Sequence, residues 1–278
     1  MRVGIVGCAG RMGRANMREA LEAEGVALAG GVERAGHPAL GQDLGDLAGL
    51  DPVGLVATDD LAGLLAASDA VIEFSTPAAT IATAALAAAR GSCAHVIGTT
   101  GLDAAQAEAL REAARRVPIV WAPNMSLGVN LLLGLVEQVA RALDPDGFDI
   151  EILEMHHRHK VDAPSGTALA LGHAAARGRG VELDTAAVRA RDGITGPRAA
   201  GQIGFAALRG GDVVGDHRVL FAGLGERLEL AHVATDRRIY ARGALRAATW
   251  ASAPRPPGLY GMADVLGLVA AEQQPRAG

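Results

Sequence analysis

RVGIVGCAGRMG, residues 2–13, decides how the first part of this chain folds. It opens with a short, nearly all-apolar run, which is typical of a parallel strand buried on both faces. Gly7, Gly10 and Gly13 follow in the spacing G-x-x-G-x-x-G, and residues 11–24 then place apolar or small side chains at helical intervals. Glycines between a strand and a helix let the backbone approach a pyrophosphate, which the helix N-terminus stabilises. The stretch therefore predicts a dinucleotide-binding unit; glycines that serve only the turn are the alternative.

Two charged residues at the end of the next expected strand, 26–33, bear on which dinucleotide is bound. Glu33 lies 20 residues after Gly13, where the adenosine ribose hydroxyls are read. A carboxylate there suits the free 2′-hydroxyl of NADH, whereas the guanidinium of the adjacent Arg34 suits the 2′-phosphate of NADPH. The presence of both leaves NADH and NADPH open as cofactors, and Arg34 can equally be a solvated loop charge.

Strands and helices continue to alternate as far as Asn124. The expected elements are strands at 69–75, 94–100 and 118–123 and helices at 77–90 and 103–116. This alternation predicts a doubly wound parallel sheet. The motifs EFSTP (73–77), GTTG (98–101) and APNMSLGVN (122–130) follow strands, at the edge where open α/β sheets bind ligands. Ser, Thr and Pro also start helices, so the first two motifs can be helix caps only.

The pattern changes after Asn124. The expected elements are helices at 128–143, 165–177 and 236–252, a strand at 148–157, and short strands between 201 and 234, with PRPPGLYG (254–261) as a loop. The fold class is therefore α/β, with a Rossmann-like doubly wound parallel sheet domain and a smaller α+β domain with a mixed sheet. We expect the dinucleotide-binding domain at 1–126, joined by the C-terminal segment 237–278, and the second domain at 127–236.

The composition narrows the classes of function. The chain has 278 residues, half of them hydrophobic, which suffices for a sizeable core. A net charge of −5 and only 3% aromatic residues argue against a nucleic-acid surface. No apolar run reaches the length of a membrane span, and the N-terminal residues lack the layout of a signal peptide, so we expect no membrane association. Cys8 and Cys93 cannot form a disulfide framework, which fits a reduced cytoplasmic setting.

The stretch EMHHRHKVDAPSGTAL, residues 154–169, contains three histidines and a lysine within five positions. His156, His157 and His159 lie beside Lys160, the single lysine among 26 basic residues. Arginine holds its proton at any ordinary pH, whereas lysine can release one when its surroundings lower its pKa. Lys160 is therefore interpreted as a compact ammonium or a proton donor, with an ordinary surface lysine as the alternative.

The Pro-Ser-Gly-Thr turn that follows predicts an anion site. Ser165 or Thr167 can cap the next helix, and the backbone N–H groups of Ser165, Gly166 and Thr167 are expected to be free at its start, where they form a carboxylate cradle. Lys160 adds a positive charge, and the histidines offer protons near neutral pH. The combination predicts a small, multiply charged acid held facing a nicotinamide.

Two other interpretations of the histidine stretch are weaker. A metal site is disfavoured because lysine is a poor partner among metal ligands and no cysteine or carboxylate cluster lies at zinc spacing nearby, so no metal is expected. A solvated polar loop is the second alternative.

Four motifs together resemble one enzyme family. GCAGRMGR, VIGTTG, APNMSLGVN and HHRHKVDAPSGTAL occur in this order in 4-hydroxy-tetrahydrodipicolinate reductases, also called dihydrodipicolinate reductases, which serve lysine and diaminopimelate synthesis. The resemblance covers essentially the whole chain, and the histidine motif is its most diagnostic part. The departures from the family pattern lie on the cofactor side: Cys8 where a small residue is usual, Glu73 where Asp is common, and Met125 where Phe is frequent.

The resemblance implies a role for each matching residue. His156 would be the general acid/base and Lys160 the proton donor. A dicarboxylate substrate would be bound by His157, Lys160, Gly166 and Thr167, with Ser165 added from the cradle. The implied cofactor-binding residues are Gly7, Cys8, Ala9, Gly10, Arg11, Met12, Glu33, Arg34, Gly98, Thr99, Thr100, Ala122, Pro123, Asn124 and Met125. The family is tetrameric, and its second domain carries the substrate site and the subunit contacts.

Two competing functions remain. Another two-domain nicotinamide-dependent dehydrogenase of a small amino or dicarboxylic acid would share the first 120 or so residues. It has no reason for the histidine–lysine–cradle motif. A nucleotide-sensing module without chemistry would not need the single lysine beside two histidines.

Overall fold

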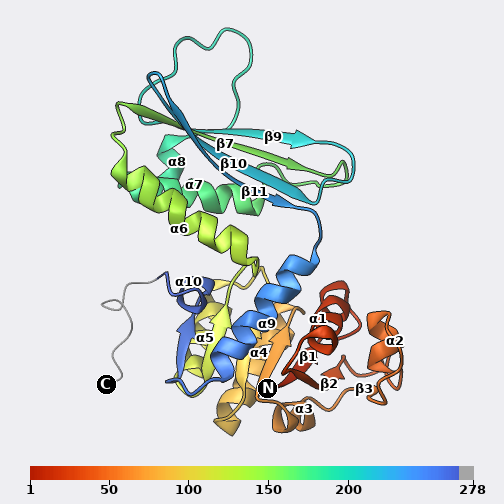
Figure 1. The fold of residues 1–278 in the computed structure, drawn as a ribbon. Helices are drawn as coiled ribbons and strands as arrows, with labels where there is room; N and C mark the ends of the chain where they lie inside the picture. The colour runs from red at the N-terminus through yellow and green to blue at the C-terminus, as the bar shows by residue number, and fades with distance from the viewer. Residues whose placement is uncertain (269–278) are drawn as a thin grey trace. The chain divides into compact units, whose positions relative to one another are not determined.

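The computed structural model describes residues 1–268 and divides the chain into two compact units (Figure 1). The first contains Met1–Leu127 and the chain from Arg238 onward, and the second is Gly128–Arg237. Residues 269–278 of the expected C-terminal segment lie outside the described residues. No helix within residues 1–268 combines the length and apolar character needed to cross a membrane.

The first unit is built on a seven-stranded parallel sheet, which confirms the predicted doubly wound class. Its strands are β1 (Arg2–Val6), β2 (Ala27–Val32), β3 (Ala57–Thr58), β4 (Ala70–Glu73), β5 (Ala94–Ile97), β6 (Pro118–Trp121) and β12 (Gly258–Tyr260), in the order β12-β6-β5-β4-β1-β2-β3. The strand order reverses between β1 and β4, which is where such sheets bind dinucleotides.

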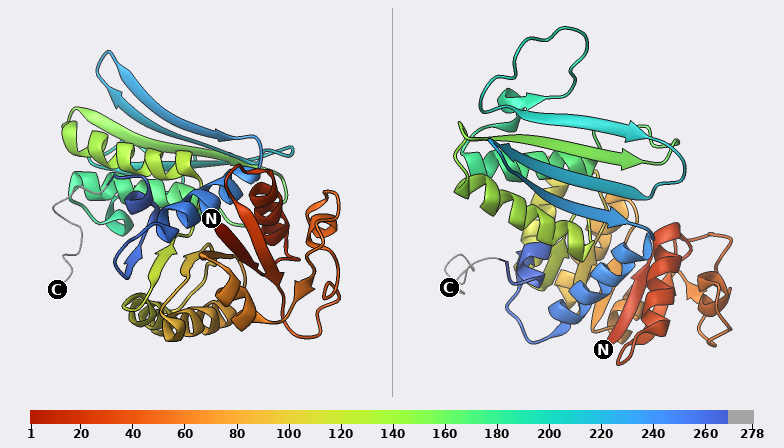
Figure 2. Two further views of the ribbon diagram at one scale, coloured as in Figure 1. Left: turned by 60° about the horizontal axis from the view of Figure 1, so that its bottom comes forward. Right: turned by 45° about the horizontal axis from the view of Figure 1, so that its top comes forward.

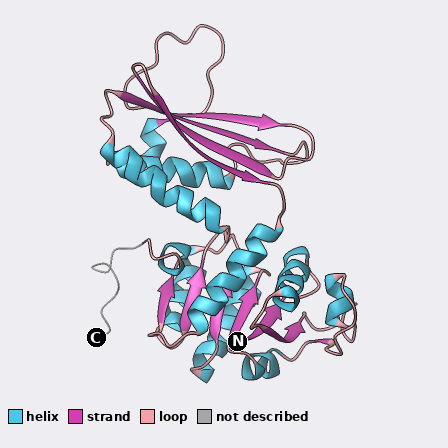
Figure 3. Cartoon of the chain, viewed as in Figure 1, coloured by secondary structure: helices cyan, strands magenta, loops and turns pink. Residues whose placement is uncertain are grey.

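Helices cover both faces of this sheet (Figures 2 and 3). They are α1 (Arg11–Glu22), α2 (Leu44–Ala48), α3 (Leu61–Ala67), α4 (Pro77–Arg90), α5 (Ala104–Ala114), α9 (Arg238–Ser252) and α10 (Met262–Val265). Helices α1 and α9 pack together on one face, while α3, α4 and α5 follow one another on the other face. Local chemistry sets the helix starts: Thr76 caps α4, and Asp103 with Gln106 forms a capping box at α5.

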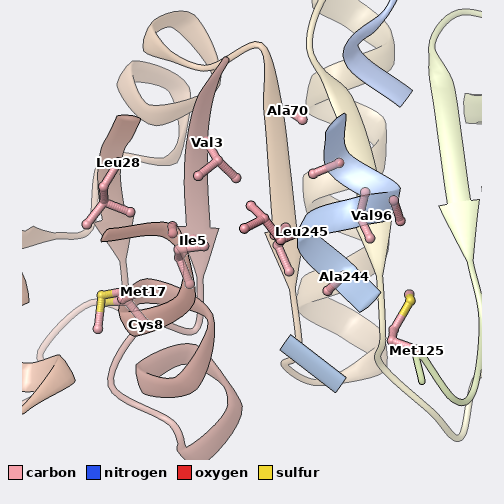
Figure 4. Close-up of a cluster of buried hydrophobic side chains, with 14 of the residues drawn as sticks. Val3, Ile5, Cys8, Met17, Leu28, Ala70, Val96, Met125, Ala244 and Leu245 are labelled. Atoms are coloured by element: carbon pink, nitrogen blue, oxygen red, sulfur yellow. The ribbon is translucent and has the colours of Figure 1, made fainter. Parts of the chain in front are cut away.

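The C-terminal part of the sequence completes the first unit. Met17 from α1 and Ala244 and Leu245 from α9 join residues of the strands in one core (Figure 4). A Cβ atom built at Gly243 would lie 1.6 Å from the carbonyl oxygen of Met125, so α9 can approach this closely only with glycine there. The expected loop at 254–261 was partly wrong, because Gly258–Tyr260 pairs in parallel with β6 as the edge strand β12.

The second unit is a five-stranded mixed sheet with helices on one face (Figure 1). Its elements are α6 (Leu127–Ala142), β7 (Phe148–His156), α7 (Gly166–Arg179), α8 (Leu183–Ala186), β8 (Ala187–Val188), β9 (Ile203–Arg209), β10 (Gly215–Gly223) and β11 (Arg227–Ala234). The order β11-β10-β7-β9-β8 combines antiparallel and parallel pairs. Residues of α6 and α7 bury the inner face of β7, β9 and β10, as the predicted α+β pattern requires.

Candidate active site

The glycine turn brings backbone atoms unusually close together. Gly7 has φ +76°, and a Cβ atom built at Gly13 would lie 2.1 Å from the carbonyl oxygen of Gly7. Gly10 is the N-cap of α1. A side chain at Gly13 would therefore separate the turn from the helix, whose first N–H groups point toward an anion in such turns.

A cavity of about 560 Å³ opens beside this turn. Of the expected cofactor residues, its lining contains Gly7, Gly10, Glu33 and Arg34. Glu33 Oε1 accepts a hydrogen bond from Ala9 N at 3.0 Å, so the carboxylate is fixed to the turn, while Arg34 is exposed. Glu33, which suits NADH, and Arg34, which suits NADPH, thus line the same cavity.

The remaining expected cofactor residues take different positions. Cys8 and Met125 point into the core, which leaves only their backbone for a ligand (Figure 4). Thr99 is buried, and its hydroxyl accepts a hydrogen bond from Ser75 N at 3.0 Å. The residues that do not line the cavity are Cys8, Ala9, Arg11, Met12, Gly98, Thr99, Thr100, Ala122, Pro123, Asn124 and Met125.

A buried carboxylate organises the histidine stretch in the second unit. Glu154, only 1% exposed, accepts hydrogen bonds from His156 Nδ1 at 2.6 Å and from Ser165 N at 3.0 Å. Arg209 forms a bidentate pair with the same carboxylate at 2.7 and 2.8 Å. Burial alone would raise the pKa of Glu154, but these hydrogen bonds from Arg209, His156 and Ser165 leave the pKa lowered, so the carboxylate is ionised near neutral pH.

The hydrogen bond to Glu154 determines which ring nitrogen of His156 can exchange a proton with a substrate. An ionised carboxylate only accepts, so Nδ1 of His156 is the donor and Nε2 is left to exchange a proton. A Cβ atom built at Gly215 would lie 3.0 Å from Nε2, so glycine keeps the space beside this nitrogen open. His156 is mostly buried on β7, in a form suited to general acid/base chemistry.

His217 lies edge-on to His156, with ring centroids 5.1 Å apart. Burial, together with the charge of His156, lowers the pKa of His217 to about 4. It is therefore neutral at ordinary pH and packs against the acid/base histidine without adding charge. Its Nε2 lies 3.1 Å from Ser165 Oγ.

The start of α7 differs in part from the predicted cradle. The expectation that Ser165 N is free was wrong, because this N–H donates to Glu154. The Ser165 hydroxyl caps α7 by accepting from Ala168 N at 3.1 Å, and the side chain is only 2% exposed. Gly166 is exposed in the first turn, where a backbone N–H has no intrahelical acceptor, and Thr167 follows it.

Positive charge gathers beside this turn. Lys160 Nζ pairs with Asp162 Oδ1 at 2.8 Å, and its side chain is 21% exposed. A hollow of about 740 Å³ is lined by His157, Arg158, His159, Gly211, Asp212 and Arg237. Desolvation, followed by the charges of Arg237, His159, His156 and Lys160, lowers the pKa of His157. The surroundings are therefore cationic enough to favour an anionic ligand.

Four residues of this site are not predicted from the sequence: Glu154, Arg209, His217 and Arg237. A signal existed for Glu154, because residues two apart on a strand share a face and Glu154 precedes His156 by two. Arg209 and His217 are brought there by pairing: His156 is opposite Arg209, and Glu154 is opposite His217. Within residues 1–268, no group of three or more His, Cys, Asp or Glu could hold a metal ion, and independence from metal remains a prediction.

Comparisons with known proteins cover both units. Residues 1–125 match the family model "Dihydrodipicolinate reductase, N-terminus", and residues 128–266 match "Dihydrodipicolinate reductase, C-terminus". A 4-hydroxy-tetrahydrodipicolinate reductase of Parvibaculum lavamentivorans is 59% identical over 269 residues, covering 96% of this chain and 98% of its own length. That of Ruegeria pomeroyi is 57% identical over 264 residues, covering 95% and 97%.

A solved structure supports the same fold. The dipicolinate-bound dihydrodipicolinate reductase of Paenisporosarcina sp. TG-14 has a TM-score of 0.75 at 23% identity, covering 94% of this chain and 97% of that one. The chain belongs to the dihydrodipicolinate reductase family.

Proposed function

We propose that this protein reduces 4-hydroxy-tetrahydrodipicolinate, by way of dihydrodipicolinate, to tetrahydrodipicolinate in diaminopimelate and lysine synthesis, with NADH or NADPH as reductant. One observation of the second unit carries the proposal. Glu154 holds both the acid/base histidine His156 and the backbone at the start of α7, so proton transfer and carboxylate binding are built on one support. Family membership supports the substrate and the nucleotide cofactor.

The chain's own residues supply binding and the proton. A reduced nicotinamide cofactor, held by the residues at the glycine turn and the neighbouring strand ends, would supply a hydride to an unsaturated ring carbon conjugated with C=N. The electron pair then moves toward nitrogen, and a proton must meet it there. Lys160 or protonated His156 donates that proton, while Gly166 N and Thr167 hold a ring carboxylate in the first turn of α7. His157 and Arg237 add positive charge that favours a substrate with two carboxylates.

The activity is tested by following NADH or NADPH absorbance with the cyclic substrate generated by the preceding synthase. Aspartate and homoserine, each supplied with NAD⁺ or NADP⁺ because a dehydrogenase would oxidise them, serve as comparison substrates, since another two-domain dehydrogenase is the alternative. Oxidation of the cofactor with the cyclic substrate alone is expected. Turnover of either linear amino acid, with none of the cyclic one, would contradict the proposal.

Arg34 is expected to control the use of NADPH. Arg34→Ala should raise the KM for NADPH and leave that for NADH little changed, because only NADPH carries the 2′-phosphate. Loss of one charged hydrogen bond corresponds to roughly tenfold. Steady-state kinetics with both nucleotides measures this, with Arg115→Ala as the control, because Arg115 is exposed and directly follows α5. Equal changes for both nucleotides would place Arg34 outside the ribose pocket.

We infer that the protein assembles as a homotetramer through the sheet of the second unit. Within residues 128–237, no helix covers the outer face of this sheet. Alternation along the strands places Val233, Asp216, Met155 and Leu208 in one cross-strand row on that face, with Val233 55% and Leu208 48% exposed. The exposed apolar side chains of Val233 and Leu208 on this uncovered face support a protein–protein contact there.

Sedimentation velocity tests the assembly. The wild type should sediment as a tetramer, and Leu208→Glu should give smaller species because it would bury an unpaired charge. A monomeric wild type would contradict the inference.

Cys8 and Cys93 are both free thiols, which supports our placing of the enzyme in the reducing cytoplasm.

A further inference from the structure

A carboxylate–imidazole pair is buried behind the wall of the cavity in the first unit. Glu73 ends β4 and His95 lies in β5; both are 0% exposed. Glu73 Oε2 and His95 Nε2 are 2.7 Å apart. Burying two polar side chains in a sheet core costs free energy compared with apolar residues of similar size, so a role beyond packing is expected for the pair.

The other ring nitrogen shows how the proton is arranged. His95 Nδ1 is buried and has no hydrogen-bond partner among the residues that the structure describes. A proton on Nδ1 would have no acceptor at this buried position, so the geometry places a proton on Nε2, which donates to Glu73. Both oxygens of Glu73 then accept, Oε2 from His95 and Oε1 from Ser75 Oγ, as an ionised carboxylate does.

Glu73 in turn fixes the hydroxyl of Ser75. Ser75 Oγ lies 2.5 Å from Glu73 Oε1, and Ser75 N donates to Thr99 Oγ1 at 3.0 Å. Because an ionised carboxylate can only accept, the Ser75 hydroxyl donates to Glu73 and keeps its lone pairs for the cavity, which Ser75 lines. This part of the wall is therefore an acceptor backed by a buried negative charge.

The Ser75 hydroxyl and the glycine turn favour different ligand groups. N–H groups at the turn favour a phosphate, whereas Ser75 backed by Glu73 disfavours one and suits a hydroxyl donor. Along the sheet edge, Glu33 follows β2, the glycine turn follows β1, and Ser75 follows β4. A dinucleotide that runs from its adenosine ribose at β2 past its pyrophosphate at β1 reaches β4 with its other ribose.

We propose, on the basis of the proposed function, that Glu73 and His95 are positioning residues that hold Ser75 as an acceptor for a hydroxyl of the nicotinamide-side ribose. The pair thereby contributes to affinity for the nicotinamide half of the cofactor and not for its adenosine half.

Calorimetric titration of the full chain with NADH and with ADP, which lacks the second ribose, tests this. Ser75→Ala, Glu73→Gln and His95→Leu should each weaken NADH about threefold to tenfold and leave ADP unchanged. His95→Gln should retain NADH affinity, because its side-chain amide can donate from nearly the same place as the imidazole Nε2. Glu108→Gln on the exposed side of α5 is the matched control and should change neither ligand.

Ser75→Ala separates positioning from folding, since it leaves the Glu73–His95 pair in place. Wild-type NADH affinity in Ser75→Ala would overturn the proposal, as would equal losses of NADH and ADP in all three variants. A similar loss in His95→Gln and His95→Leu would also overturn it, because the donor would then not matter. Failure of the wild type to bind either ligand would instead contradict the proposed function.

Discussion

Lys160→Arg is expected to lower kcat almost as far as Lys160→Ala does, by about a hundredfold to ten-thousandfold, the range for loss of a general acid. The arginine keeps the positive charge and can still pair with Asp162, which lies 2.8 Å from the lysine ammonium. It does not release a proton at ordinary pH, so it cannot replace lysine as a donor. The chain carries arginine at its 25 other basic positions besides histidine, and only this position has lysine.

Chemical rescue distinguishes a proton donor from a charge. A small primary ammonium added to Lys160→Ala should restore part of kcat, whereas guanidinium at the same concentration should not. Arg189→Ala, an exposed cation on the loop after β8, provides a control for lost surface charge and should keep wild-type kcat. Near wild-type kcat in Lys160→Arg would mean that Lys160 serves as a charge only.

The sequence predicts the parallel sheet well because of where its strands lie. β1, β4 and β5 are almost wholly buried, so apart from Arg2, Glu73 and His95 they consist of apolar residues and glycine, and glycine or helix starts follow them. The sequence predicts no helix or strand between 44 and 67. Its helices α2 and α3 have five and seven residues and β3 has two, too short for a periodic pattern to stand out.

The candidate site was predictable only where its residues are close in sequence. His156, His157 and Lys160 stand out within five positions, and the helix start follows at once. Arg209 is 55 residues from Glu154, and only the pairing of β9 with β7 brings the two together. Closeness in sequence can also mislead. The N–H of Ser165 is expected to bind a ligand, but it donates to the carboxylate of Glu154 on β7 instead.

Glu154→Gln is expected to lower kcat by about a hundredfold to ten-thousandfold while leaving the fold intact, the range seen when a carboxylate that orients a catalytic histidine becomes an amide. All the groups around this carboxylate are donors: His156 Nδ1, Ser165 N and the two Arg209 nitrogens. The side-chain NH₂ of a glutamine is itself a donor, so at one of the two oxygen positions it would face two other donors. If the amide faces His156, the imidazole must accept at Nδ1 and carry its proton on Nε2, which is the wrong tautomer for a base.

Stability measurements separate this effect from unfolding. The pKa of Glu154 is lowered in the folded state, so its contribution to the unfolding free energy is full above the unfolded value of about 4.3 and is lost as the pH falls through the folded value. Glu154→Gln should therefore be less stable than wild type at pH 7, and the difference should shrink on acidification below about pH 4. Glu137→Gln is the matched control, because Glu137 also pairs with two arginines, Arg141 and Arg177, in the same unit. It should change stability only slightly and leave kcat unchanged. A Glu154→Gln enzyme that is destabilised but turns over at the wild-type rate would show that Glu154 supports only the fold, and that His156 does not depend on it for its tautomer.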